Sequence, residues 1–363
     1  MLAPGVTGTG GGGLTEPVSW TFTTGAPHTT LSNQITFLTD RSGVANLWAM
    51  NVDGTAAHQL STELTAVLDY AVSPDGNSFV VGDGRRLVMV DADGSNRRVL
   101  TEEGFLEFDP TYAPDGQRLA FARADATTGS GMGIWERPIP GDPERIELPP
   151  DAIPTQTPTA SGDSEPAPEW VRAPRYSPDG EALAFVDATG VVGVVELTTD
   201  TVTRVDYEAQ APPLWLSDGS AVLLTGQAAD AGSETAPLAA PVEPLEPTGG
   251  ATVGVLRRSG NAVQETGFGD GVTAAAVAGD GRIAYLRDDG SLRITDDAGE
   301  PGRVPAVLGG ERIGAVAFAP GEDAMVVVVL GSDPEVGRIE RIELGGNAQD
   351  LLANDGWRPR WLP

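Results

Sequence analysis

Residues 110–123 read PTYAPDGQRLAFAR, and this stretch decides the fold. A β-rich run ends at Tyr112, the turn Pro-Asp-Gly follows at 114–116, and a second β-rich run begins at Arg118. Proline presets φ, aspartate accepts backbone hydrogen bonds and glycine tolerates positive φ, so this tripeptide suits a tight reversal. The stretch therefore predicts two antiparallel strands joined by a short turn.

The same pattern repeats along the chain. Pro-Asp-Gly stands at 74–76, 114–116 and 178–180, and partial copies of the turn follow later. Two residues before each copy, and again before the last residue, lies a β-forming residue that we call the anchor. The anchors are Val72, Tyr112, Tyr176, Trp215, Val277, Phe318 and Trp361. Four of the six steps between them are close to 40 residues and two are roughly 22 residues longer, which indicates a repeat architecture.

Each repeat has the pattern of one propeller blade. Residues 110–148 contain four β-rich runs separated by turns, and four antiparallel strands every ~40 residues are typical of a blade. The seven anchors predict an all-β, seven-bladed β-propeller, with six blades as the alternative if one degenerate copy is incomplete. Residues 35–60 have three runs and no anchor, whereas 357–363 have an anchor and no further runs. We expect 357–363 to pair with 35–39 and close the ring, which removes two open sheet edges.

Composition excludes several classes of protein. The chain has 363 residues, 40% of them hydrophobic, no cysteine, and a net charge of −29 with arginine as its basic residue. Such acidity disfavours nucleic acid and anionic membrane surfaces as partners. No apolar run approaches the ~18–20 residues of a membrane-spanning helix. The acidity fits either simple solubility in a GC-rich genome or adaptation to high salt.

The first repeat carries a family resemblance. Phe37, Asp40-Arg41, Leu47-Trp48 and Asp53-Gly54, together with the Ser-Pro-Asp-Gly strings at 73–76 and 177–180, resemble the TolB-like, WD-type propeller repeat of bacteria. The resemblance covers residues 33 to 363. It implies the propeller fold, a location in the bacterial envelope, and docking to an envelope lipoprotein as the class of partner. It identifies no contact residue.

The amino-terminal 32 residues are predicted to be a separate segment. They contain a Gly-rich linker, and residues 14–25, LTEPVSWTFTTG, resemble the last strand of a bacterial Ig-like domain. We therefore expect an extracytoplasmic protein, periplasmic, secreted or on the surface, whose true amino terminus and signal peptide are missing from this sequence. The alternative is a cytoplasmic protein with an exposed tail. The propeller is assigned to residues 33–363.

Catalytic and metal-binding motifs are weak. The two histidines, His28 and His58, lack a nucleophile and carboxylate at a motif spacing. The glycines at 8–13 follow no strand and open no helix, so they do not form a dinucleotide-binding motif. The Asp-rich turns at 91–94 and 287–290 could hold calcium, but turn chemistry explains them without a metal. No catalytic residue, cofactor or metal is predicted.

The two long insertions, 149–170 and roughly 228–250, fall in connections that open on the same face of the disc, whereas the tight turns lie on the other. Loops on a rigid scaffold are the usual place for binding, although these insertions could equally be disordered spacers. The predicted binding face carries charged residues in the loops between second and third strands. They are Asp40, Arg41, Asp83, Arg85, Arg123, Asp125, Asp187, Arg287, Asp288 and Asp333. Arg41 is the first to test, since its planar fork suits a carboxylate or a sugar diol, although it could simply pair with Asp40 or a neighbouring loop.

The predicted function is non-catalytic binding by a monomer, which presents the loop-rich face to a protein or glycan of the cell envelope. The alternative is a propeller lyase or hydrolase that works with Arg, Asp and Tyr. Arginines and carboxylates that converge at the mouth of the channel would favour the enzyme, and unrelated solvated side chains there would favour binding.

Overall fold

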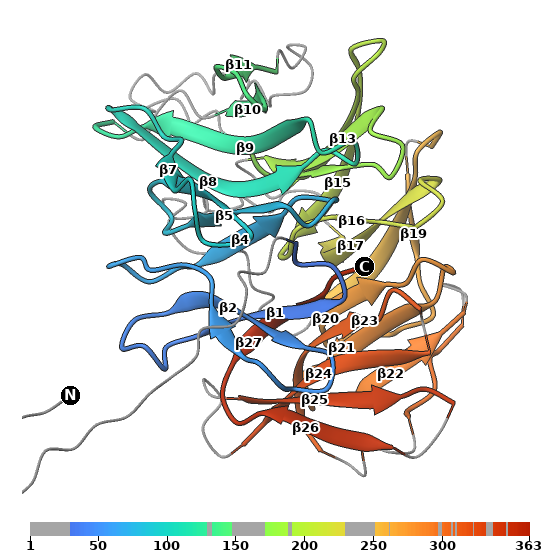
Figure 1. The fold of residues 1–363 in the computed structure, drawn as a ribbon. Coiled ribbons are helices and arrows are strands. Elements are labelled where there is room, and N and C mark those ends of the chain that lie inside the picture. The colour runs from blue at the N-terminus through green and yellow to red at the C-terminus, as the bar shows by residue number, and fades with distance from the viewer. Residues whose placement is uncertain are drawn as a thin grey trace, which may run out of the picture.

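The computed structural model describes residues 30–128, 133–146, 171–187, 191–228, 251–260, 262–296, 300–305, 308, 311–321, 323–331, 337–345 and 348–363. The regular elements in these ranges are antiparallel β-strands, which confirms the predicted all-β class (Figure 1). The Ig-like stretch 14–25, the glycines at 8–13, His28, most of both insertions, and Asp333 lie outside the described residues.

The strands follow one another as short antiparallel meanders, which we number in chain order. The first three meanders contain β1 (Gln34–Thr39), β2 (Asn46–Asn51), β3 (His58–Gln59); β4 (Asp69–Val72), β5 (Ser78–Gly82), β6 (Leu87–Asp91), β7 (Arg98–Val99); and β8 (Phe105–Tyr112), β9 (Arg118–Asp125), β10 (Gly133–Pro138), β11 (Glu144–Arg145). The next two contain β12 (Val171–Tyr176), β13 (Ala182–Asp187), β14 (Val191–Glu196), β15 (Thr201–Ala209); and β16 (Leu214–Trp215), β17 (Ala221–Ala228), β18 (Thr252–Arg257), β19 (Val263–Glu265). The last two contain β20 (Val272–Val277), β21 (Ile283–Arg287), β22 (Leu292–Thr295); and β23 (Ile313–Phe318), β24 (Ala324–Leu330), β25 (Gly337–Glu343), β26 (Gln349–Ala353).

The carboxyl-terminal strand, β27 (Trp357–Trp361), joins the first meander. The sheet order is β27-β1-β2-β3, and Ile35 of β1 faces Trp361 of β27. Figure 1 shows the red β27 lying against the blue β1. The structure therefore contains the strand pairing that the sequence predicts for 357–363 and 35–39.

Two details differ from the regular repeat. In the third meander β8 begins at Phe105, five residues before the predicted start at Pro110. The fourth and fifth meanders form one eight-stranded sheet, because the end of β15 pairs with the end of β17, with Tyr207 opposite Ala228. The sequence reasoning treated all repeats as separate four-stranded units and did not anticipate this wider sheet.

The tight turns have the predicted chemistry. Gly76 and Gly180 close two Pro-Asp-Gly turns with φ of 68° and 72°, a region where a side chain is strained. The Asp75 carboxylate accepts hydrogen bonds from the Asn77 backbone N–H, at 3.0 Å, and from the Ser73 hydroxyl, at 2.6 Å. These bonds hold the reversal between the first and second strands of a meander.

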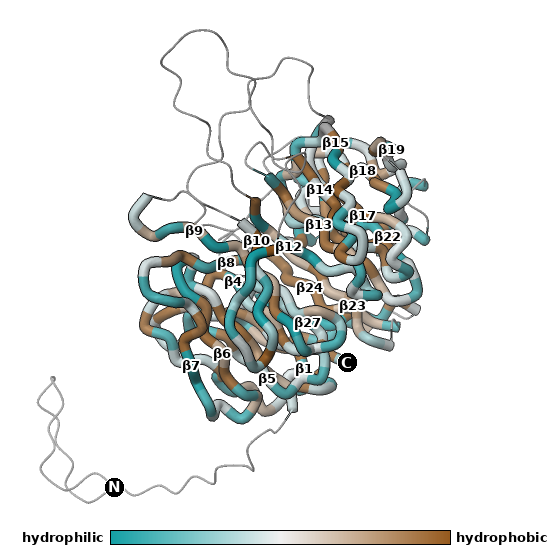
Figure 2. Tube along the Cα trace, turned by 90° about the horizontal axis from the view of Figure 1, so that it is seen from above, coloured by the Kyte–Doolittle hydropathy of each residue, from teal (hydrophilic) through white to brown (hydrophobic). Residues whose placement is uncertain are grey.

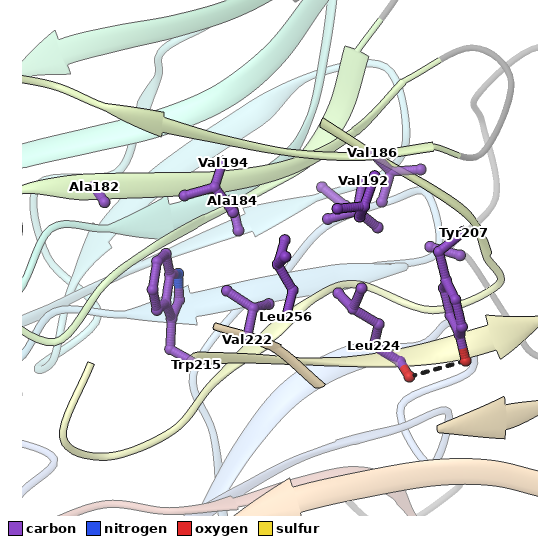
Figure 3. Close-up of a cluster of buried hydrophobic side chains, with 13 residues drawn as sticks. Ala182, Ala184, Val186, Val192, Val194, Tyr207, Trp215, Val222, Leu224 and Leu256 are labelled. Carbon is purple, nitrogen blue, oxygen red and sulfur yellow. Dashed lines mark hydrogen bonds between the residues drawn. The ribbon is translucent and has the colours of Figure 1, made fainter. Parts of the chain in front are cut away.

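The hydrophobic core lies between successive meanders. Figure 2 shows hydrophobic residues running along the strands. Figure 3 shows one such cluster, in which Val194 of the fourth meander packs near Val222 and Leu256 of the fifth. The Tyr207 hydroxyl donates to the Thr252 carbonyl at 3.0 Å and lies 3.4 Å from the Leu224 carbonyl. The chain thus buries both faces of its sheets against neighbouring meanders.

The first strand of each meander contacts the first strand of the next. The strands β4, β8, β12, β16, β20, β23 and β27 touch in this succession, and we call them the inner strands. Three of them share a bulge. Asp109, Ala173 and Arg358 have φ of 54°, 52° and 50°, each precedes a proline, and the register of pairing shifts at each place. A left-handed conformation costs a non-glycine residue about 1–2 kcal/mol.

Candidate functional site

The predicted binding residues lie where expected in the topology. Eight of the ten fall at or after the end of the second strand of their meander, counting β27 as the first strand of the first, whereas Arg123 lies inside β9 and not in a loop. Asp333 lies outside the described residues. Because these connections open on one side of the sheets, we call that side the loop face and the side of the Pro-Asp-Gly turns the turn face. The residues come from different meanders, and they do not gather at one point.

Arg41 binds a loop from the other end of the chain. Its Nη2 donates to Asp355 Oδ1 at 2.6 Å and its Nε donates to Asp355 Oδ2 at 3.1 Å. Its guanidinium also lies 4.8 Å from the Trp48 ring centroid and 5.3 Å from that of Phe37. Arg41 therefore pairs with the loop before β27 and not with Asp40, and its side chain has a structural role.

Two other candidates are buried in ion pairs. Arg123 is 3% exposed and pairs with Glu107, which is fully buried, while its Nη1 lies 3.4 Å from Glu102. Asp187 is also fully buried and accepts from Arg204 and from the Val191 backbone N–H. Buried charges of this kind need their partners to offset the loss of hydration. Arg123 and Asp187 therefore have a structural role and are not available to a partner.

Three further candidates make hydrogen bonds within their own loop or to the loop that precedes their meander. Asp83 accepts from the Thr65 hydroxyl at 2.8 Å and from the backbone of Arg86 at 2.9 Å. Burial raises the pKa of Asp83, but these hydrogen bonds outweigh it and hold the pKa below its ordinary value. Asp125 accepts from the Thr128 backbone N–H at 2.8 Å, and Arg287 donates to the Phe268 and Asp270 carbonyls.

Asp40, Arg85 and Asp288 are different. All three are exposed, and no side-chain hydrogen bond or ion pair involves them within the described part of the chain. They lie in the connections after β1, β5 and β21. Of the predicted set, these are the side chains still available to a partner.

A second set of charges lies on the inner strands, and the sequence reasoning did not select it as a site. We call it the axial cluster. It consists of Asp69 on β4, Asp109 on β8, Arg172 and Arg175 on β12, and Arg358 and Arg360 on β27.

Two ion pairs tie neighbouring inner strands together. Arg172 Nε donates to Asp109 Oδ2 at 2.9 Å, its Nη2 donates to Oδ1 at 3.2 Å, and the Ala173 N–H also donates to Oδ2. Arg358 Nη1 lies 3.7 Å from Asp69 Oδ1 and donates to the Leu68 carbonyl at 2.9 Å. Both carboxylates of the cluster are therefore engaged by arginines.

Charges from three other inner strands act on Arg175. Burial lowers its pKa, Asp69 and Asp109 raise it, and Arg360 and Arg358 lower it, with a net shift below the ordinary value. In the succession of inner strands given above, β12 and β27 are not neighbours. Arg360 therefore acts on Arg175 from a strand that is not its neighbour.

Tyr70 borders this cluster. Its hydroxyl donates to the Arg358 carbonyl at 2.7 Å, and the Arg360 guanidinium lies 4.9 Å from its ring centroid. Burial raises the pKa of Tyr70 to about 12. A general base works best with a pKa near the operating pH, so this phenol is poorly suited to accept a proton at neutral pH.

Other site types are not visible. Within the described ranges, no group of three or more His, Asp or Glu side chains could hold a metal ion. The same ranges contain no helix long and apolar enough to cross a membrane. His58 lies on the outer strand β3, as expected, and its Nδ1 is 3.0 Å from the Ala56 carbonyl.

No protein-family model matches the sequence. One curated relative is the protein TolB homolog of Chlorobium chlorochromatii, which is 22% identical over a segment covering 25% of this chain and 31% of that protein. The repeat of this chain is TolB-like. The similarity thus spans less than a third of the length of this relative.

Solved structures show the fold of this TolB-like chain. The β-propeller domain of the trilobed protease from Pyrococcus furiosus is 13% identical, with a TM-score of 0.52, and the match covers 79% of this chain and 84% of that one. An oligogalacturonate lyase from Vibrio parahaemolyticus is 14% identical, with a TM-score of 0.55, and the match covers 82% of this chain and 83% of that one. A puromycin hydrolase is 14% identical, with a TM-score of 0.61, and the match covers 92% of this chain and 54% of that one. The fold is a β-propeller. These structures include enzymes of two reaction types, so their likeness extends to the fold alone.

The axial cluster of this TolB-like propeller had a signal in the sequence. Arg175 and Arg360 each stand one residue before an anchor, and Asp69, Asp109 and Arg358 stand three before one. Aligning the repeats on their anchors would have collected all five.

Proposed function

We propose that the chain is a seven-bladed propeller whose ring is closed by β27. Seven hydrophobic clusters support this, because each joins one meander to the next. The decisive one joins the two ends of the series, where Ile35 and Phe37 of the first meander pack with Val326 and Ile339 of the seventh. A six-bladed ring would require one meander to lie outside this succession.

We further propose that this propeller binds an envelope protein without catalysis. One observation on the loop face carries the proposal. Most of the predicted charged residues bind other groups of the chain, whereas Asp40, Arg85 and Asp288 remain exposed. The TolB-like repeat supports a protein partner and an extracytoplasmic location for a monomeric disc. A glycan partner fits less well, since the described loop face offers these scattered charges and no ring of exposed aromatic residues.

A capture experiment tests this function. The full chain would be immobilised and exposed to an envelope fraction of its source organism, and bound proteins would be identified. The variant Asp40→Ala/Arg85→Ala/Asp288→Ala should capture less of the main partner. The matched control Asn77→Ala/Gln117→Ala changes exposed residues beside turns on the opposite face and should behave as wild type. If the control variant lost the partner and the loop-face variant still captured it, binding would lie on the turn face.

One observation favours the alternative, a lyase or hydrolase. Arginines and carboxylates do converge on the inner strands, as such an enzyme requires. However, Asp109 is held by two donors of Arg172, Tyr70 has a raised pKa, and the described residues place no histidine there. Incubation with oligogalacturonate and with puromycin separates the alternatives. We expect no product from either, and turnover abolished by Arg175→Gln would establish the enzyme.

A further inference from the structure

Two arginines of the axial cluster lack an acidic partner. In the described residues no carboxylate lies within ion-pair distance of Arg175 or Arg360. Arg175 Nη1 donates to the Pro174 carbonyl at 2.8 Å, and Arg360 lies over the Tyr70 ring. Both residues stand one position before an anchor, so they occupy equivalent places on their strands.

The cluster carries an excess of positive charge. It contains four arginines and two aspartates, and both aspartates are engaged by Arg172 and Arg358. This excess stands out in a chain whose net charge is −29. Like charges repel, and burial weakens the screening by water. Arg175 is partly buried, whereas Arg360 is exposed. Binding of an anion by the two guanidinium groups that have no acidic partner would offset this positive charge.

We propose that Arg175 and Arg360 bind a carboxylate of an acidic segment of the protein partner, at the centre of the disc. This inference rests on the proposed binding function and specifies the chemistry of the ligand. A planar guanidinium presents paired N–H donors that match the two oxygens of a carboxylate. Two such groups from different strands could hold one acidic side chain or a chain terminus.

The surroundings favour a peptide carboxylate over a sugar. The corresponding positions on the other inner strands, one and three before the anchor, hold mostly small or apolar residues: Ala71, Thr111, Ala173, Pro212, Leu214, Ala274, Ala276, Ala315 and Ala317. Thr111 is the one hydroxyl among them. A sugar needs many polar partners for its hydroxyls, because an unmatched buried hydroxyl costs free energy. A carboxylate on a short methylene stem needs donors at one point and tolerates alanine around it.

The test uses three probes on the intact chain: hexaglutamate peptide, trigalacturonate and inorganic phosphate. Tryptophan fluorescence can report binding, because the Trp215 indole N–H donates to the Arg175 carbonyl at 2.9 Å and Trp361 follows Arg360. We expect hexaglutamate to bind, and Arg175→Gln/Arg360→Gln to weaken it at least tenfold. Arg98→Gln, on the outer strand β7, removes one exposed charge and should change the affinity less than twofold.

A conservative variant guards against misfolding. Arg175→Lys keeps the charge but loses the paired donors, so it should fold and bind hexaglutamate several-fold more weakly. Equal binding of hexaglutamate by wild type and the double glutamine variant would overturn the proposal, as would no binding at all. Tighter, arginine-dependent binding of trigalacturonate or phosphate would overturn the choice of a peptide.

The outcome can be separated from that of the proposed function. If hexaglutamate fails to bind but Asp40→Ala/Arg85→Ala/Asp288→Ala still loses the captured partner, the axial site is wrong and the binding function stands. If hexaglutamate binds through the two arginines but no partner is captured on the loop face, the anion site stands and the proposed function is wrong.

Discussion

Arg41 and Asp355 are 314 residues apart in the sequence and form a two-pronged ion pair between the loop after β1 and the loop before β27. The same carboxylate accepts from the Thr39 hydroxyl at 2.6 Å. One acidic side chain thus links the loop after β1 to the loop that delivers the carboxyl-terminal strand.

Removing this link should weaken the fold modestly. Both side chains are about one-third exposed, and partly exposed pairs contribute roughly 1 kcal/mol. We expect Asp355→Ala to lower the free energy of unfolding by about 1 kcal/mol, measured by denaturant titration. Asp350→Ala, an exposed carboxylate on β26 with no partner in the described residues, is the matched control. If Asp350→Ala lowered the free energy of unfolding by as much, the ion pair of Arg41 and Asp355 would not be the cause of the loss.

Deleting residues 357–363 should lower the unfolding midpoint by many degrees. The deletion removes the partner of β1 and exposes a sheet edge that favours aggregation. Thermal denaturation and light scattering measure the two effects. An unchanged midpoint would contradict the proposed closure of the ring.

The two carboxylates beside Arg123 should contribute very different amounts to the free energy of unfolding. Glu107 is fully buried, whereas the Glu102 side chain is 49% exposed. Glu107→Gln keeps the shape but leaves a buried guanidinium without its counter-charge, which costs about 3 kcal/mol or more. Glu102→Gln should cost less than about 1 kcal/mol. Similar losses in the two variants would show that Arg123 is better hydrated than its burial indicates.

Acid should destabilise the turn at Asp179. Burial raises the pKa of Asp179, but hydrogen bonds from Ser177, the Glu181 N–H and Arg258 outweigh it and lower the pKa to about 2. An unfolded aspartate titrates near 3.9. The folded state therefore gains stability from this carboxylate above about pH 4 and loses it as the pH falls toward 2. Asp179→Asn should show a lower midpoint at pH 5 and a shallower decline below pH 4, and Asp350→Asn should follow wild type.

Sodium chloride should raise the thermal midpoint. A net charge of −29 makes the folded chain repel itself, and salt screens this repulsion. The increase should be visible between low and molar salt in a thermal scan. A flat response would mean that the acidic residues are too dispersed to repel, and adaptation to high salt would lose its support.

The sequence was sufficient for the strands and turns because these depend on local chemistry. The Pro-Asp-Gly turns and the three strands at 35–60 follow from patterns a few residues long. The pairing of 357–363 with 35–39 follows from the repeat count, because each end of the chain holds the strands that the other lacks. The partner of Arg41 could not be predicted, since Asp355 comes near only when both ends of the chain meet. The axial cluster is hidden for a different reason: Arg175 and Arg360 are 185 positions apart in the sequence, and only their equal place before an anchor relates them.

The prolines that follow the three bulges have a further effect. Pro110, Pro174 and Pro359 lie on inner strands, each directly after a residue with positive φ. Proline has no backbone N–H, so a strand that carries it offers an incomplete ladder of donors. A foreign β-strand entering the middle of the disc would find this ladder interrupted on three of the inner strands. Recognition by an added strand is therefore disfavoured at these three inner strands.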